Sequence, residues 1–418
     1  MESESIERVI KEESLQVLEN IGVKCTNQKV IDTFESTYMA AYDSTTKRLH
    51  ITGDLVKACL ASAPKRGKFP IPERSFGGGG VALYVKRGDD YIVPKVEIHV
   101  AEMMDMAEEY NVPFMFKGAS GKFTPSEEEK QIDIIRKYYS GYLYLRTETR
   151  IGIQKAKEEN ERTGKICTTH SPLGSPLKFN ELSEKNTKGI DNIELLYECV
   201  NENLPIYLTS MPITCLSGPA SLYGIALQSY AEFLAGLCLV QILNPGLLVV
   251  NGAYPSAGNP LQYYAPALGS ISHNMANWLV AKVSNIDQIP SLQSGCTIST
   301  KSHNPLPNGT DPETEKGYKF WNRVHDWHQV RHSFGFIDTL AAFDLHKMQR
   351  DLHALNRIKE NCEKLDVNFQ DIKYDPEAYT AIENGVDVDD FRNLQHTTKN
   401  VGIIDNFQIL EEYEKCEI

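Results

Sequence analysis

Short apolar runs alternate with polar breaks and amphipathic stretches along most of the chain. Seven runs have the length of buried strands, at residues 113–116, 142–146, 165–169, 205–209, 247–250, 290–293 and 331–337. Around them, apolar residues at helical spacing predict helices at 100–110, 126–139, 148–161, 188–202, 221–243, 263–283 and 312–327. Because each pair of successive parallel strands needs a crossover helix, this order predicts an α/β fold, a TIM (β/α)8 barrel whose chemistry lies at the carboxyl ends of its strands.

The two ends of the chain differ from this repeat. Residues 1–66 carry helical patterns at 6–21 and 54–63, and we expect them to form an N-terminal helical extension. The barrel domain then covers residues 67–360, and the polar residues 361–418 form a divergent C-terminal tail or lid. An eighth strand must come from the Gly-rich segment around residues 77–80 or from residues 401–405. The four glycines are typical of a flexible turn, or of a loop that lets a ligand approach the backbone.

The bulk composition is that of a globular protein and narrows the choice of partners. Of the 418 residues, 41% are hydrophobic and 24% are charged, and no apolar run reaches the ~18 residues of a membrane-spanning helix. A formal net charge of -13 argues against nucleic acid as a partner and permits a cationic substrate. The first residues lack the features of a secretory signal, and the nine cysteines contain no C-x-x-C pair. We therefore expect a cytoplasmic protein that does not act at a membrane.

Residues that end or follow the predicted strands are the candidates for a substrate-binding site at the barrel mouth. Most of these candidates carry amide, hydroxyl, imidazole or aromatic groups, and they are His170, Met211, Asn251, Tyr254, Gln293, Ser294, Cys296, His332 and Phe334. Carboxylates are rare among them, and the carboxylate pair that a glycosidase needs is missing. The sequence therefore predicts a site that binds and orients a small molecule rather than one that performs acid–base hydrolysis.

Metal binding and a reactive thiol are two further possibilities at these positions. His325, His328 and His332 would share one face if their segment were wholly helical, and three imidazoles can bind zinc. We expect instead that a helix ends near residue 327 and a strand begins by residue 331, which separates the three histidines. No pattern supplies a base to activate Cys296, so we interpret it as a packed or spectator thiol. The sequence thus predicts no tightly bound metal or nucleotide.

An ordered series of short motifs carries a resemblance to a known family. The motifs are Met-Pro at 211–212, Ser-Gly-Pro-Ala-Ser-Leu-Tyr-Gly at 217–224, Ala-Glu-Phe-Leu-Ala-Gly at 231–236, Gln-Ile-Leu-Asn-Pro-Gly at 241–246 and Asn-Gly at 251–252. Weaker matches in the same order extend the likeness from about residue 10 to about residue 350, and the tail after about residue 361 differs. The series resembles the trimethylamine methyltransferase family, corrinoid-dependent enzymes that include glycine betaine methyltransferases without pyrrolysine.

This resemblance implies a TIM barrel that passes a methyl group from a methylated amine to the Co(I) corrinoid of a partner protein. The donor would be a quaternary or tertiary methylamine in the barrel mouth, with Tyr254 and Phe334 against its cation, and the chain itself would hold no cofactor tightly. Pyrrolysine is absent, so trimethylamine is not the expected donor. Two alternatives stay open, namely a non-catalytic binder of a methylated amine or corrinoid protein, and a zinc-dependent barrel enzyme. A homo-oligomer is compatible with each of these.

Overall fold

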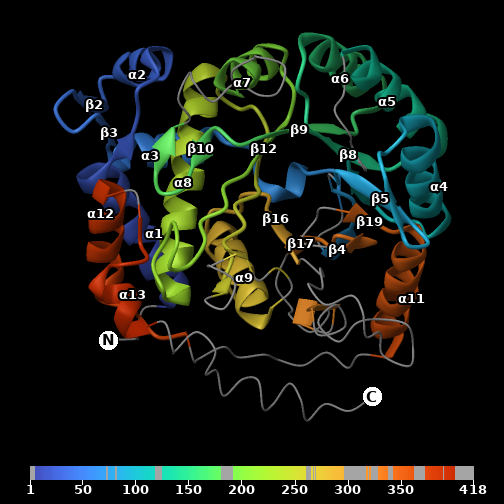
Figure 1. The fold of residues 1–418 in the computed structure, drawn as a ribbon. Helices are drawn as coiled ribbons and strands as arrows, with labels where there is room; N and C mark the ends of the chain where they lie inside the picture. Colours follow the sequence, from blue (N-terminus) through green and yellow to red (C-terminus); the bar gives the residue numbers. More distant parts are fainter. Residues whose placement is uncertain are drawn as a thin grey trace.

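Eight short parallel strands form a closed ring at the centre of the protein (Figure 1). The computed structural model describes residues 5–71, 74–80, 82–117, 125–179, 192–259, 265–266, 268, 270–295, 317–318, 320–321, 328–337, 342–361, 372–388 and 390–400. The ring strands are β4 (Arg74–Gly77), β7 (Phe114–Phe116), β8 (Tyr142–Leu145), β9 (Ile166–His170), β12 (Ile206–Leu208), β13 (Val249–Asn251), β16 (Leu292–Ser294) and β17 (His328–Arg331).

Every contact around the ring is parallel. Continuous ladders join β7 to β8, β9, β12 and β13 in that order, and join β16 to β17 and β4. Two single bridges close the ring, from Gly78 to Met115 and from Asn251 to Ser291. The architecture is therefore a (β/α)8 barrel, and the Gly-rich segment supplies its missing strand.

Helices surround this ring, and smaller sheets flank it (Figure 1). The barrel helices are α4 (Ala101–Glu109), which follows a π-helical turn at Val96–Val100, then α5 (Pro125–Tyr138), α6 (Arg150–Thr163), α7 (Asn192–Asn201), α8 (Leu222–Leu243), α9 (Ile271–Ile286) and α11 (Leu345–Asn361). One flanking sheet contains β5 (Tyr84–Arg87), β6 (Asp90–Ile92), β18 (Phe336–Ile337) and β19 (Ala342–Phe343), and β14 (Gly258–Asn259) pairs with β15 (Ala265–Pro266).

Aromatic rings fill the inside of the barrel. The ring of Tyr144 stacks on Phe116 at 4.8 Å between centroids, and it meets Phe114 at 5.7 Å and Tyr207 at 5.2 Å. These large side chains need space on the neighbouring strands. A Cβ atom at Gly77 would overlap the Phe114 ring. Gly77, the last residue of β4, therefore admits the aromatic core, and the sequence-based interpretation of it as part of a flexible turn was wrong.

The long helix α8 is apolar on all sides because protein covers all of its sides. Its mean hydropathy over an 18-residue window is 1.4, and 94% of that window is buried. This is the one helix in the described residues that is long and apolar enough to span a membrane, and its burial is that of a core helix. The expectation that no apolar stretch reaches such a length was therefore wrong for α8. Within it, the buried carboxyl of Glu232 accepts hydrogen bonds from Ser175 Oγ (2.7 Å) and Leu177 N (3.1 Å).

The N-terminal residues cover α8 and also form strands, which the sequence analysis did not predict. The elements are α1 (Ile6–Gln16) with a π-helical turn (Val17–Ile21), α2 (Gln28–Glu35), α3 (Gly53–Ser62), a 3-10 turn (Arg66–Lys68), β1 (Val23–Lys24), β2 (Ala40–Asp43) and β3 (Arg48–Ile51). Their sheet also takes in β10 (Leu173–Gly174) and β11 (Lys178–Phe179), which follow β9 in the chain. The extension is thus joined to the barrel through both α8 and this sheet.

The C-terminal helices pack beside the N-terminal extension, on the left of Figure 1. They are α12 (Ala378–Val388) and α13 (Gln395–Asn400). Asp375, just before α12, accepts a hydrogen bond from Ser221, whose side chain also caps α8, and lies 2.8 Å from His396 Nε2. This part of the tail therefore fixes the start of α8. The three-part division of the chain at residues 66 and 360 stays a prediction.

The seven predicted strands are all present, and one predicted position was wrong. Six lie within two residues of the expected ranges, but the seventh begins at His328 rather than at residue 331. Because β17 ends at Arg331, the residues expected to lie on this strand follow it instead. The helix expected from residue 263 begins at Ile271, and residues 401–405 lie outside the described part of the chain.

Replacing Gly77 by alanine should lower the free energy of unfolding by roughly 1–3 kcal/mol, because the added methyl group overlaps the Phe114 ring. Chemical denaturation measures this. Gly67→Ala is the matched control, since an added Cβ atom there meets nothing within 4 Å. Equal stability of the two variants would show that the aromatic core does not depend on this glycine.

Candidate functional site

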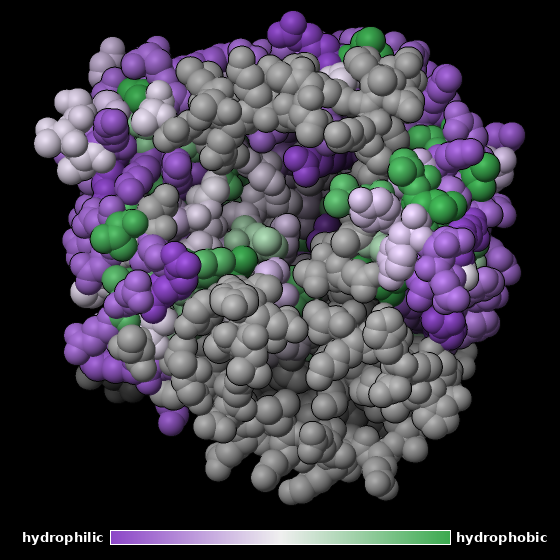
Figure 2. Space-filling model, in the orientation of Figure 1, coloured by the Kyte–Doolittle hydropathy of each residue, from purple (hydrophilic) through white to green (hydrophobic). Residues whose placement is uncertain are grey.

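A pocket of about 250 Å³ lies at the carboxyl ends of the barrel strands. Its lining is Gly80, Phe116, Lys117, Tyr144, Arg146, Thr147, Thr169, His170, Ser171, Asn192, Leu195, Thr209, Tyr254 and Arg331. Figure 2 shows a hollow over β8, β9 and β12, with hydrophilic side chains inside it. The position is the one at which barrel enzymes place their active sites.

Three cationic side chains line this pocket, each at the end of a different strand. Lys117 directly follows β7, Arg146 directly follows β8, and Arg331 is the last residue of β17. The ammonium of Lys117 donates a hydrogen bond to the Arg146 carbonyl oxygen at 3.2 Å. No carboxylate is among the lining residues that the structure describes, although Glu148 approaches Arg146 Nε at 3.6 Å from outside the lining. The charged side chains of the described lining are therefore all cationic, in a chain of net charge -13.

His170, the last residue of β9, is neutral in this environment. Burial, with a smaller contribution from the positive charge of Arg146, lowers the pKa of His170 to about 3. The imidazole is therefore unprotonated at neutral pH. It can donate or accept a hydrogen bond, but it cannot act as a cationic acid.

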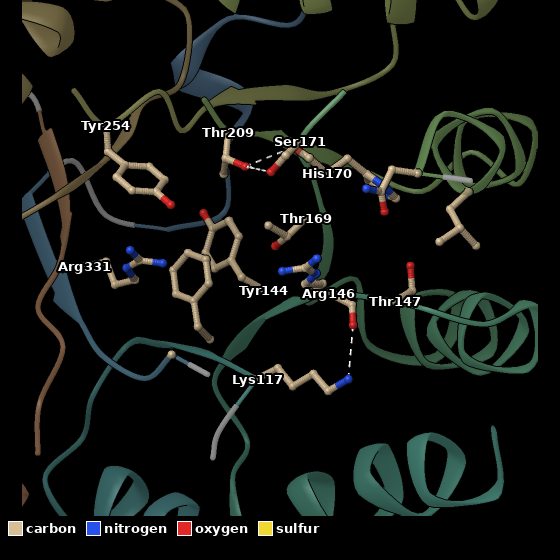
Figure 3. A pocket seen from close by; sticks show the side chains of 14 residues that line it. Lys117, Tyr144, Arg146, Thr147, Thr169, His170, Ser171, Thr209, Tyr254 and Arg331 are labelled. Carbon is tan, nitrogen blue, oxygen red and sulfur yellow. Dashed lines mark hydrogen bonds between the residues drawn. The ribbon is translucent and has the colours of Figure 1, made fainter. Parts of the chain in front are cut away.

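Several buried polar atoms of the lining find no hydrogen-bond partner among the described residues. They are the Tyr144 hydroxyl, Thr169 Oγ1 and His170 Nε2. Figure 3 shows the Tyr144 ring between the guanidinium groups of Arg331 and Arg146, with Tyr254 beside Arg331 and Thr169 beside Arg146. A buried polar group without a partner costs roughly 1–3 kcal/mol, so these atoms are available to hydrogen-bond a polar ligand or ordered water.

Arg331 contacts two aromatic rings of the lining. Its guanidinium carbon lies 4.7 Å from the centroid of Phe116 and 5.5 Å from that of Tyr254. These are cation–π distances, so a protein cation already occupies part of the aromatic surface that a ligand cation could use.

Of the nine candidate residues, two line the pocket, namely His170 and Tyr254. Three others lie in or beside the barrel wall. Asn251 donates to Ser284 Oγ at 2.7 Å and accepts from Ala253 N at 2.9 Å, Gln293 donates to the Asn251 carbonyl at 3.4 Å, and the Ser294 amide donates to Asn277 Oδ1 at 3.3 Å. These hydrogen bonds join neighbouring strands and helices of the barrel.

Three more candidates are not among the lining residues that the structure describes. His332 stacks on Phe76 at 5.5 Å, and the fully buried Phe334 fills the space beside Gly78. Met211 is half-buried in the loop after β12. Cys296 lies outside the described residues. The ring of Phe334 is enclosed by the barrel, and its expected contact with a ligand cation stays a prediction.

The histidine triplet is only partly described. His328 begins β17 and His332 follows that strand, whereas His325 lies outside the described residues. Within the described parts of the chain, no three His, Cys, Asp or Glu side chains form a group that could hold a metal ion. Zinc binding through all three histidines stays an untested alternative.

The cations of the pocket are the site residues that the sequence analysis missed. Each is a single Lys or Arg at the carboxyl end of an apolar strand, and that pattern could have identified Lys117 and Arg146. The predicted site residues carried amide, hydroxyl and aromatic groups instead. The prediction also made Arg331 the first residue of its strand, although Arg331 is the last.

The fold and this site define a barrel enzyme with a cationic pocket that lacks carboxylates in its described lining. The family model for trimethylamine methyltransferase (MTTB) matches residues 156–405, which is more than half of the chain. The chain therefore belongs to the trimethylamine methyltransferase family. The match continues through α12 and α13, so the expectation that the likeness ends near residue 361 was wrong.

Curated relatives give two examples of what such proteins act on. A proline betaine:corrinoid methyltransferase from Eubacterium limosum is 25% identical over 284 residues, which are 60% of this chain and 55% of that protein. A glycine betaine methyltransferase from Desulfitobacterium hafniense (strain Y51) is 22% identical over 322 residues, 70% of this chain and 64% of that protein. The chain thus spans less than two thirds of either relative's length.

Among solved structures, a truncated 3-deoxy-D-arabino-heptulosonate 7-phosphate synthase from Thermotoga maritima superposes with a TM-score of 0.40 at 11% identity. The superposition covers 70% of this chain and 90% of that one. This score is too low to support the fold, which rests on the strand pairing described above.

The lowered pKa of His170 predicts a pH dependence of stability. Because the unfolded chain takes up this proton near the ordinary pKa of 6.5, the free energy of unfolding should fall as pH drops from about 6.5 towards about 3. His170→Gln should flatten this slope in urea denaturation at a series of pH values. His346→Gln, at an exposed position on α11, is the matched control. Parallel curves for wild type and His170→Gln would contradict the assignment.

Proposed function

We propose that this chain transfers a methyl group from a quaternary ammonium compound with an anionic group to the cobalt of a corrinoid held by a partner protein. The cationic pocket without a carboxylate in its described lining carries the proposal. Membership of the trimethylamine methyltransferase family supports the reaction class. Glycine betaine, the compound named for one relative, has both a quaternary nitrogen and a carboxylate.

The described lining holds neither a carboxylic acid nor a protonated imidazole, which supports a quaternary rather than a tertiary donor. When the C–N bond breaks, its electron pair goes to nitrogen, and a quaternary amine leaves as a neutral tertiary amine without needing a proton. A tertiary amine leaves readily only if its nitrogen is protonated or otherwise activated. The described lining holds no carboxyl group, and His170 is neutral, so neither of the usual side-chain acids is present.

The residues of the pocket would bind and align the donor. Lys117 and Arg146 provide charge-assisted hydrogen bonds to its anionic group, and Tyr254 lies against its methylated end. Holding the methyl carbon in one orientation and excluding water are the main contributions expected of the protein.

The size of the pocket suits a reaction in which this chain binds the amine and a partner protein carries the corrinoid. A volume of about 250 Å³ suits a small methylated amine and leaves a corrinoid outside, over the mouth of the barrel. There the reduced cobalt supplies the nucleophilic electron pair for the transferred methyl group. The corrinoid and its carrier protein therefore belong to the proposal as partners of this chain.

The described lining of the pocket predicts which amines are demethylated. With Co(I) corrinoid protein, glycine betaine should produce the absorbance of the methylated corrin, and trimethylamine should not, because the described lining holds no carboxyl group or protonated imidazole that would keep its nitrogen protonated. Stopped-flow absorbance measures both reactions. Equal rates with the two amines would contradict the proposal, and binding of betaines without any methyl transfer would favour the non-catalytic alternative.

The cationic lining predicts the effect of removing one charge. Lys117→Met should raise the KM for the betaine roughly 10- to 100-fold, because a charge-assisted hydrogen bond contributes about 1.5–3 kcal/mol. Lys130→Met, on the exposed face of α5, removes the same charge at a residue outside the pocket lining and should leave KM near the wild-type value. Similar KM values for both variants would show that the anionic group does not bind at Lys117.

A further inference from the structure

A second cavity, of about 400 Å³, lies between the N-terminal extension and the C-terminal helix α12. Its lining comes from β1, β3, β11, the turn between β2 and β3, and α12. The charged lining residues are Lys24, Lys47, Arg48, Lys178 and Asp387. As far as the structure describes the two linings, this cavity shares no residue with the pocket at the barrel mouth. Its volume is in the range of small-molecule sites.

Strand pairing places three of the cations side by side. Lys24 of β1 lies opposite Lys178 of the parallel strand β11, and opposite Arg48 of the antiparallel strand β3. Residues that lie opposite each other in a sheet have side chains on the same face, so the three cations form one row across β11, β1 and β3. Like charges directly opposite each other destabilise a sheet, and a bound anion would remove this repulsion.

Arg48 is a buried and fixed cation of this row. Its side chain is 8% exposed, and its guanidinium donates to the Ile21 carbonyl oxygen at 2.9 Å and pairs with Asp387. The side chain of Asp387 is 64% exposed, so water screens this ion pair. Asp43 of β2 also lies opposite Arg48, but its carboxylate accepts a hydrogen bond from Thr46 Oγ1 at 2.8 Å. The wall of the cavity therefore contains a guanidinium in a defined position.

Lys24 and Lys47 add two ammonium groups to the same cavity. Within the part of the chain that the structure describes, neither ammonium has a hydrogen bond or an ion pair. Their backbones are held in place, because Lys24 N donates to the Leu177 carbonyl and Cys25 N donates to the Lys47 carbonyl, each at 2.9 Å. Lys178 has interactions of its own, so we assign the ligand to Lys24, Lys47 and the guanidinium between them and α12.

We propose that this cavity binds a phosphate dianion, either free or as the monoester of a small organic molecule. A phosphate monoester carries a charge of about -1.5 to -2 at pH 7, which matches the two ammonium groups. Lysine binds phosphate as a point charge, and the Arg48 guanidinium in the wall adds a further donor. The ligand joins β1 to the β2–β3 turn and so stabilises the folded extension. This site does not depend on the methyl-transfer reaction.

Titration of the full chain with three phosphates at constant ionic strength tests the proposal. The compounds are inorganic phosphate, glycerol 3-phosphate and adenosine monophosphate, and isothermal titration calorimetry should show saturable binding of at least one of them. Replacing both lysines, Lys24→Met with Lys47→Met, should raise the Kd at least roughly tenfold. Tighter binding of an ester than of inorganic phosphate identifies an organic ligand, and the reverse order identifies free phosphate.

Three single variants locate the bound phosphate. Lys47 is exposed on a turn, so Lys47→Met alone should fold normally and raise the Kd at least roughly threefold. Lys57→Met, at an exposed position on α3, removes the same charge outside the described cavity lining and should keep the wild-type Kd. Lys117→Met should also keep it, because Lys117 belongs to the lining at the barrel mouth. Thermal denaturation without phosphate checks that each variant is folded.

Four results would overturn the inference. They are the absence of saturable binding for all three phosphates, a wild-type Kd in the double variant, a loss of binding in Lys117→Met, and equally tight binding of sulfate and chloride. The third result would place the phosphate in the barrel mouth, and the fourth would show an adventitious ion only. A methyl-transfer assay is not needed for any of these outcomes, so they leave the proposed function untouched.

Discussion

Aromatic rings from neighbouring strands fill the barrel and contact one another at 4.8–5.7 Å, and the position of the pocket depends on this packing. Phe116 and Tyr144 belong both to the packed interior and to the pocket lining. The residues that follow these strands, Lys117 and Arg146, then lie at the mouth. Gly77 of β4 leaves the space for this packing, because a side chain there would occupy the volume of the Phe114 ring.

The electrostatics of the pocket contrast with those of the whole chain. The net charge is -13, yet the described lining combines three cations with a neutral imidazole. Such a pocket is poorly suited to protonate a leaving group and well suited to hold an anion close to a reaction that needs no proton. This combination is compatible with the proposed methyl transfer from a quaternary nitrogen, and it connects the family membership to the residues of this particular chain.

The sequence predicted the barrel because apolar runs such as 142–146 mark buried strands directly. The sequence left the strand β4 as one of two alternatives for the eighth strand. Its segment runs into the four glycines at residues 77–80, and glycines contribute no apolar side chains to a hydrophobic pattern. The uniformly apolar α8 also departed from the amphipathic pattern, because the N-terminal extension covers its outer side. Both features depend on residues far away in the sequence, which a local pattern cannot show.

The candidate site was harder to predict than the fold. His170 and Tyr254 were found because they follow strands, whereas Gln293 and Asn251 also satisfy that rule and yet bond within the barrel wall. A strand end alone does not say whether a side chain points into the pocket. The position of β17 added a second error. Its predicted start was three residues too late, so the prediction selected His332 and Phe334 as site residues and not Arg331.

The most direct measurement of the central claim follows the methyl group itself. The chain is mixed with Co(I) corrinoid protein and a quaternary ammonium donor labelled with ¹³C in its N-methyl groups, and NMR follows the label. The account predicts that the label appears on the corrinoid and that one equivalent of the tertiary amine forms for each methylated corrin. A donor that binds in the pocket but keeps all of its labelled methyl groups would contradict it.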